Sequence, residues 1–193
     1  MAVHTHTPTP VPAPVPAPPF VAEAERERPI AQWGARVAAR LIDWVIVLVP
    51  AAIVALVIAL VWIGGQALDG LRDGSVAWRN FVIIFSVVYF LILTVYDTVL
   101  VKGRRRTFGK SLLKLEVAPA DNGGRPGPIP VASIIARSAV LNIGSLTMAL
   151  GWAAVVFIGP FAVLAVVIWP LWDRPNHQGA HDKVARTVVV RAN

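Results

Sequence analysis

Residues 38–63 read AARLIDWVIVLVPAAIVALVIALVWI, and this stretch decides the class of protein. After Arg40, its only charged residue is Asp43. About 20 apolar residues, at a rise of 1.5 Å per residue, cross the hydrocarbon core of a bilayer. Pro50 can kink such a helix, which membrane helices tolerate. The stretch therefore predicts a transmembrane helix at about residues 36–64.

Three further apolar segments follow along the chain. The second segment of the chain carries a single acid, Asp97. The third is short and contains Arg137, so it is either a full crossing or a re-entrant helix, whereas the fourth has no charge and reads as a regular crossing. We expect an all-α membrane protein, a small bundle of four transmembrane helices, with three crossings as the alternative. The later helices are expected at about residues 78–101, 130–146 and 151–172.

The composition indicates that much of the chain lies in lipid, and it excludes several kinds of chemistry. Of the 193 residues, 56% are hydrophobic and 15% are charged, against roughly a quarter charged in soluble domains. The net charge is +7, but the basic residues flank apolar runs, which indicates anionic lipid headgroups and not nucleic acid as the partner. There is no cysteine, the four histidines have no metal-ligand spacing, and no nucleophile lies beside a base. We therefore expect no metal, no cofactor and no enzymatic activity.

The distribution of basic residues predicts the orientation in the membrane. The loop after the second segment reads KGRRRTFGKSLLKLEVAPADNGGRPGPIP and is the most basic connection, so we place it in the cytoplasm. Both flanks of the apolar region are also basic, which favours two cytoplasmic termini and an even number of crossings. Within the loop, SLLKLEVAP predicts a short strand and DNGG a turn. The β-branched run at residues 187–190 predicts a second strand that pairs with the first.

The N-terminal residues 1–28 differ in composition from the membrane domain expected at residues 29–193. Proline alternates with Ala, Val and Thr up to Phe20, and EAERER follows. Because proline lacks an amide donor and fixes φ, this tail is expected to be extended or disordered. It is either a flexible tail or a docking site for a proline-binding partner.

Asp43 and Asp97 lie inside apolar segments, where a charged residue costs at least about 2.5–3.5 kcal/mol on insertion scales. Asp43 either is neutralised by Arg40, three residues earlier, or faces a polar cavity and binds a cation or proton. Asp97 either reaches towards Lys102 or Arg104, or shares a depth in the inner leaflet with Asp43. If the two carboxylates approach one another, the pKa of one should rise.

Four collinear motifs resemble the RDD family of bacterial membrane proteins. They are RVAARLID at residues 36–43, RTFGKSLLKLEV at residues 106–117, Arg137 before the last helix, and AHDKVARTVVV at residues 180–190. The resemblance covers roughly residues 30–191. Two positions depart from the family pattern, because arginine stands at Arg105 and at Arg186 where the family has glycine. We expect the tight turns there to be altered.

The resemblance implies Arg36, Asp43 and Asp182 as principal site residues. We add Asp97, Arg137 and His181 to this polar or ion site, with Arg40, Gly109 and Lys110 in support, and we expect Arg36 or Arg137 to pair with Asp182. The resemblance also implies the inner membrane of a bacterial cell and transport of an ion or small ligand, including cation/proton exchange. The alternative is a non-catalytic membrane scaffold or assembly factor. In either case we expect a homo-oligomer or a partner within a membrane complex.

Overall fold

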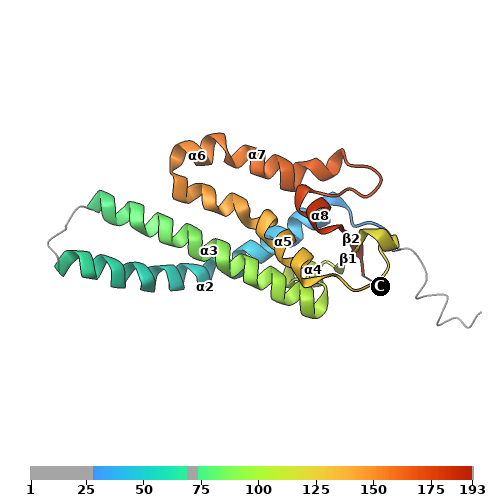
Figure 1. Cartoon of the computed structure of the whole chain (residues 1–193), viewed down its shortest axis with the longest axis horizontal. Coiled ribbons are helices and arrows are strands. Elements are labelled where there is room, and N and C mark those ends of the chain that lie inside the picture. The colour runs from blue at the N-terminus through green and yellow to red at the C-terminus, as the bar shows by residue number, and fades with distance from the viewer. Residues whose placement is uncertain (1–27, 69–73, 193) are drawn as a thin grey trace, which may run out of the picture.

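The structure is a computed structural model, and it describes residues 28–68 and 74–192. The tail expected at residues 1–28 therefore lies, apart from Arg28, outside the described residues. Two long antiparallel helices, α2 (Trp33–Leu68) and α3 (Gly74–Arg104), form the longest part of the molecule (Figure 1). Both extend three or four residues beyond the predicted crossings at each end, because the residues that flank each apolar run continue the helix.

A second, shorter pair of helical segments packs beside α3 (Figure 1). Its outgoing arm is α5 (Val131–Asn142), which continues as the 3₁₀ helix η2 (Ile143–Leu150). Its returning arm changes helical type along its length because Pro160 removes a backbone donor and crowds the preceding turn. The returning elements are α6 (Trp152–Phe157), α7 (Gly159–Val163), the π-helical turn η3 (Leu164–Ile168) and η4 (Trp169–Leu171).

Within the described residues, three helices are long and apolar enough to cross a membrane: Trp33–Gln66, Gly74–Arg104 and Val131–Leu150. The returning arm contributes only a shorter apolar helix, Gly159–Leu171. The prediction of a helical membrane protein is therefore confirmed, whereas the predicted count of four transmembrane helices is not. The third segment is the continuous one despite Arg137, because that arginine is paired inside the protein, and the fourth is the interrupted one.

The remaining elements gather at one end of the molecule, which we call the sheet end (Figure 1). Strand β1 (Leu115–Pro119) pairs antiparallel with β2 (Thr187–Arg191), so that Val117 lies opposite Val189. Ile30 forms a bridge to Val190 on the other side of β2. The predicted two-strand element is thus confirmed. The short helices of the sheet end are α4 (Phe108–Leu112), η1 (Ala120–Asn122) and α8 (Ala180–Ala185).

A stripe of mostly small residues allows α2 to approach its neighbours closely. Apart from Arg40, the buried residues of α2 recur every fourth position, which places them along one side of the helix. Leu93 of α3 packs against this side. The stripe consists of Ala39, Asp43, Val47, Ala51, Ala55 and Ala59.

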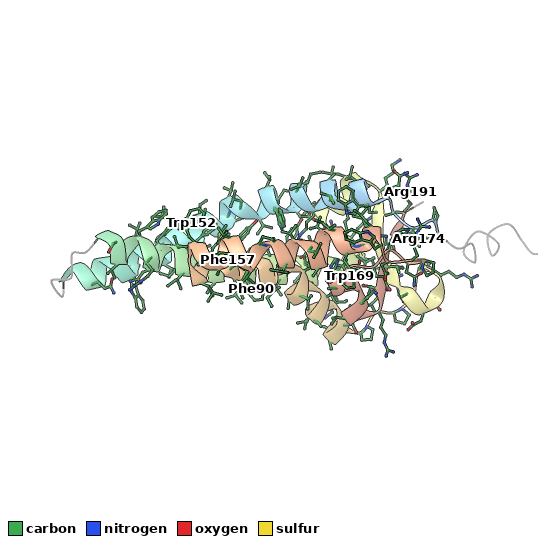
Figure 2. All side chains as sticks on the ribbon, turned by 90° about the horizontal axis from the view of Figure 1, so that it is seen from above. Phe90, Trp152, Phe157, Trp169, Arg174 and Arg191 are labelled. Carbon is green, nitrogen blue, oxygen red and sulfur yellow. The ribbon has the colours of Figure 1, made fainter. Side chains whose placement is uncertain are left out.

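The outer surface of the helices is apolar, as expected for contact with lipid. Large apolar side chains are exposed, with Trp152 at 83% and Phe157 at 71%. Figure 2 shows these two residues on the helical part of the molecule, whereas Arg174 and Arg191 lie at the sheet end. The outer surface of the helices is therefore apolar, and the sheet end carries basic residues.

The two positions where arginine replaces the family glycine keep a glycine-like backbone. Arg105 has φ 57° and Arg186 has φ 51°, both in the left-handed region that favours glycine. The carbonyl of Arg105 accepts from Val117 N at 2.8 Å, and that of Arg186 accepts from Ala120 N at 2.9 Å. Hydrogen bonds to the β1 region therefore hold both arginines in a backbone conformation that glycine favours.

Candidate functional site

Three carboxylates are buried where the helices enter the sheet end. Asp43 and Asp97 are 0% exposed, and Asp182 is 1% exposed. Ionised carboxylates tolerate burial only when charged or hydrogen-bonding partners compensate them. Each of the three has a different set of partners, so we describe them in turn.

Asp43 is held by neutral donors from α3 and from the turn into α4. Its Oδ1 accepts from the Tyr96 hydroxyl at 2.7 Å and from Gly109 N at 2.8 Å, and its Oδ2 accepts from Thr107 Oγ1 at 2.6 Å. Thr107 is also the N-cap residue of α4, since its Oγ1 accepts from Lys110 N. The carboxylate thus fastens the first turn of α4 to the N-terminal part of the buried stripe on α2.

This arrangement depends on glycine at position 109. A Cβ atom there would lie 2.0 Å from the carbonyl oxygen of Ala39 and 3.1 Å from Cγ of Asp43. Both contacts are with helix α2. The first is with the helix backbone, which cannot move aside as a side chain can. The sequence motif around Gly109 is therefore explained by close approach of two helices.

Arg40 does not neutralise Asp43, contrary to one of the two interpretations of the sequence. Positions 40 and 43 differ by about 60° around the helix axis, so Arg40 points to α3 and α5 while Asp43 faces α4. Arg40 Nη1 donates to Asp97 Oδ1 at 3.2 Å and to Oδ2 at 2.9 Å. Its Nη2 donates to Asn142 Oδ1.

Asp97 is consequently part of a buried link between three helices. Besides Arg40 of α2, it accepts from Asn142 Nδ2 of α5 at 3.1 Å. The interpretation that Asp97 reaches towards Lys102 or Arg104 is wrong, because Asp97 faces the bundle and those basic residues are exposed. Asp97 instead fixes α2 and α5 against the central helix α3.

Asp182 joins α8 to α5 through a strong ion pair. Arg137 donates from Nε to Asp182 Oδ1 at 2.9 Å, and its Nη2 lies 2.8 Å from the same oxygen. Thr187 Oγ1 donates to Oδ1 at 3.3 Å, and His181 Nε2 lies 3.4 Å from Oδ2. The structure therefore contains the pair between Arg137 and Asp182 that we expected.

Arg36 completes the same group from the first turn of α2. Its Nη1 lies 4.0 Å from Asp182 Oδ2 and donates to the carbonyl of His177 at 2.6 Å. Its Nη2 donates to the carbonyl of Val189 at 3.0 Å. Arg36 thus connects α2, the segment before α8, and strand β2.

Lys110 differs from the arginines because no hydrogen bond or ion pair of its ammonium group occurs within the described residues. Its side chain is buried, with 6% of the residue exposed. Burial and the nearby Arg137 lower the pKa of Lys110 to about 8, against the opposing effect of Asp97 and Asp43. Lys110 is therefore the least compensated cation of the site.

His181 and Asp182 have strongly shifted pKa values. Burial lowers the pKa of His181 to about 3, although Asp182 opposes this shift, so the imidazole is neutral at neutral pH. Burial alone would raise the pKa of Asp182, but His181, Arg137 and Arg36 together bring it down to about 2. Asp182 is therefore the ionised member of this pair.

A small cavity of about 60 Å³ lies among these side chains. Cationic residues from α2, α4 and α5 line it together with His181 and Asp182 of α8 and apolar residues of the returning arm. The cationic residues are Arg36, Arg40, Lys110 and Arg137. Asp43 and Asp97 do not line this cavity.

All nine residues selected from the sequence thus lie near the sheet end, but they form two connected sites. Asp43 and Gly109 form the α4 anchor, and the others surround the cavity or, like Asp97, support it.

Sequence reasoning did not assign Tyr96, Thr107 and Asn142. A polar residue within an apolar segment was the available signal for Asn142, and a threonine just before a short helix was the signal for Thr107. In residues 28–68 and 74–192 no three His, Asp or Glu side chains are grouped to hold a metal ion.

Gly109→Ala should displace α4 from α2. The added methyl group clashes with the Ala39 carbonyl, and Asp43 then loses donors whose hydrogen bonds to a charged group are worth roughly 1.5–3 kcal/mol each. We expect a loss of about 3 kcal/mol in the free energy of unfolding, measured by thermal unfolding in detergent. Gly103→Ala is the matched control, because nothing lies within 4 Å of a Cβ atom there. Equal stability of the two variants would contradict the close approach.

The buried ammonium of Lys110 should make stability rise with pH between about 8 and 10.5. In that window the unfolded chain, with an ordinary lysine pKa of 10.5, binds more protons than the folded chain, so raising the pH favours folding. The gain is up to about 3 kcal/mol, at 1.36 kcal/mol per pKa unit. We expect it as a difference in thermal stability between the native chain and Lys110→Met. A difference that stays constant with pH would show that Lys110 is not held in a cationic, desolvated site.

Comparison with known proteins gives one informative match. The family model of the RDD family matches residues 30–186, which is most of the chain. No curated protein and no solved structure matches. The matched region begins before α2, ends after α8, and includes all nine site residues that were selected from the sequence. The chain therefore belongs to the RDD family.

Proposed function

We propose that this integral membrane protein moves an ion or a small ligand across the inner membrane of a bacterial cell, through the polar site at its sheet end. The observation that carries the proposal is the burial of charged residues beside a cavity in a protein whose outer surface is apolar. Intramembrane ionisable residues are expensive and typically mark pathways of ions or substrates. Buried ion pairs with a purely structural role would pack together without leaving a cavity between them.

The proposal includes four crossings. The returning arm from Trp152 to Leu171 lies antiparallel to α5 and η2 and is apolar throughout (Figure 1). About 20 helical residues at 1.5 Å each match a hydrocarbon core of roughly 30 Å. Breaks such as that near Pro160 are accommodated in membrane helices when neighbouring helices and side chains satisfy the freed groups.

The proposal also places the sheet end in the cytoplasm. Arg28 at the start of the described chain and Arg191 near its end both belong to the sheet end, where Arg28 binds Glu116 at 2.6 Å. The basic loop between α3 and β1 lies there as well, whereas the described residues of the opposite end carry one basic residue, Arg79. The positive-inside bias then orients both ends of the chain to the cytoplasm.

Labelling of single cysteines tests this topology, and the natural chain has no cysteine that would interfere. Arg191→Cys and Arg125→Cys should react with a membrane-impermeant maleimide only in inside-out vesicles. Leu150→Cys, in the turn between the two arms and 70% exposed, should react only in right-side-out vesicles or intact spheroplasts. Labelling of residues 150 and 191 from the same side would contradict four crossings.

The geometry favours an anionic ligand over cation/proton exchange. Asp43 accepts three hydrogen bonds and Asp97 is paired with Arg40 and Asn142, so neither carboxylate is free to coordinate a cation. Among the charged side chains that line the cavity, four are cationic and one, Asp182, is a carboxylate. An anion would reduce the repulsion among these groups, whereas a cation would increase it.

Flux through proteoliposomes tests transport. Vesicles that contain the purified protein and a pH-sensitive dye are exposed in turn to gradients of phosphate, Na⁺ and K⁺. We expect flux for the anion and at least about tenfold slower flux for Asp97→Asn, because the neutral side chain releases Arg40 from its ion pair. Asp121→Asn, an exposed carboxylate at the sheet end, is the matched control. Absence of flux for every ion, or loss of protein abundance without a change in flux per molecule, would favour a scaffold instead.

A further inference from the structure

The cavity at the sheet end is built from groups that complement an anion. Its volume of about 60 Å³ has room for roughly four or five water-sized spheres, which suits a small tetrahedral oxyanion. Four cationic side chains line it, against one carboxylate, Asp182. Arg40 and Arg137 are paired with carboxylates, but Lys110 has no such partner in the described part of the chain. The lining therefore has an excess of positive charge.

Three nitrogen atoms of the lining residues are buried without a hydrogen-bond partner. They are Arg40 Nε, Arg137 Nη1 and His181 Nδ1. Buried polar groups in folded proteins are almost always satisfied, and leaving one unpaired is unfavourable. Arg137 is 1% exposed and His181 7% exposed, so these groups are not satisfied from the protein surface. Their common position around one cavity indicates a ligand that binds inside it.

His181 restricts the class of anion that can bind in the cavity. Its Nε2 lies 3.4 Å from Asp182 Oδ2, and the negative charge of this carboxylate favours the neutral tautomer that carries its proton on Nε2. The low pKa of His181, about 3, keeps the second nitrogen unprotonated. Nδ1 is then an acceptor among donors, and it requires a ligand that offers one proton.

From this arrangement we propose that the cavity binds a singly protonated phosphate group, either inorganic phosphate or the phosphomonoester headgroup of a lipid. Arginine and lysine donate to the phosphate oxygens, and His181 Nδ1 accepts from the phosphate hydroxyl. Guanidinium groups match phosphate oxygens in geometry and charge. The inference deepens the proposed function, on which it rests for the identity of the transported ion, whereas binding itself does not require transport.

A second cavity adjoins this site. It has a volume of about 410 Å³ and shares Trp33, Arg36 and Pro170 with the smaller cavity. Its other lining residues, such as Ile30 and His177, belong to the sheet end. The phosphate group therefore enters from the sheet end, past Arg36 at the junction of the two cavities.

Isothermal titration of the purified protein in detergent with inorganic phosphate tests the site. We expect saturable binding that Lys110→Met weakens at least about tenfold, because one charge-assisted contact is lost. Lys102→Met is the matched control, an exposed lysine outside both cavities, and should leave binding unchanged. Since Lys110 forms no side-chain ion pair among the described residues, its loss should leave the protein folded, which is checked by gel filtration.

Two comparisons separate the possible ligands. Sulfate, which has no proton to donate, should bind more weakly than phosphate, and His181→Phe should reduce this preference by removing the acceptor. Phosphatidic acid should displace phosphate if the lipid headgroup is the source, and phosphatidylglycerol, a phosphodiester, should not. Failure to bind both phosphate and phosphatidic acid, or equal binding by Lys110→Met, would overturn the proposal. Phosphate binding without flux would refute only the transport function.

Discussion

The ion pair between Arg137 and Asp182 is the contact on which the arrangement of the sheet end depends. Both side chains are almost fully buried, and two donors of the arginine reach one carboxylate oxygen. Removing one partner of such a pair leaves an uncompensated buried charge, which costs about 3–5 kcal/mol. Because α8 is only six residues long, it has little stability of its own, and this pair holds it against α5. The position of α8 in turn places His181 and strand β2.

Burial of charge also explains why the helices meet where they do. Asp97 can remain ionised only because Arg40 and Asn142 reach it from α2 and α5. Asp43 requires the donors of Tyr96 and of the turn into α4. In lipid, apolar surfaces gain little from associating with one another, so hydrogen bonds and close packing specify the helix contacts. The polar groups near the sheet end therefore specify the register of the bundle.

Much of the fold was predictable from the sequence because the relevant signals are local. Apolar runs long enough to cross a bilayer located α2 and α3, and the β-branched residues near the C-terminus located β2. The fourth segment was less predictable, because its apolar composition conceals the changes of helical type around Pro160. Hydropathy reports where a segment lies and does not report whether its backbone is regular.

The membership of the site was also largely predictable, but its pairing was not. Charged residues in apolar segments stand out, so Asp43, Asp97 and Arg137 could be selected directly. Which arginine meets which carboxylate depends on the rotation of each helix and on contacts between residues far apart in sequence, such as Arg40 with Asp97. Neighbours along the chain, such as Arg40 and Asp43, suggested a pair that the packing of α4 against α2 prevents.

The pairing of β1 with β2, and the bridge from Ile30 to β2, has a mechanical consequence. The start of α2, the end of α3, the start of α5 and the end of the returning arm are all tied to one small sheet. The sheet is therefore a fixed point that both helical pairs share, and the two pairs extend away from it. Any large rearrangement of the protein should then change the distance between the helix ends remote from the sheet, while distances near the sheet change little. A site beside the sheet can in this way keep its geometry while the distance between the far ends of the two helical pairs changes.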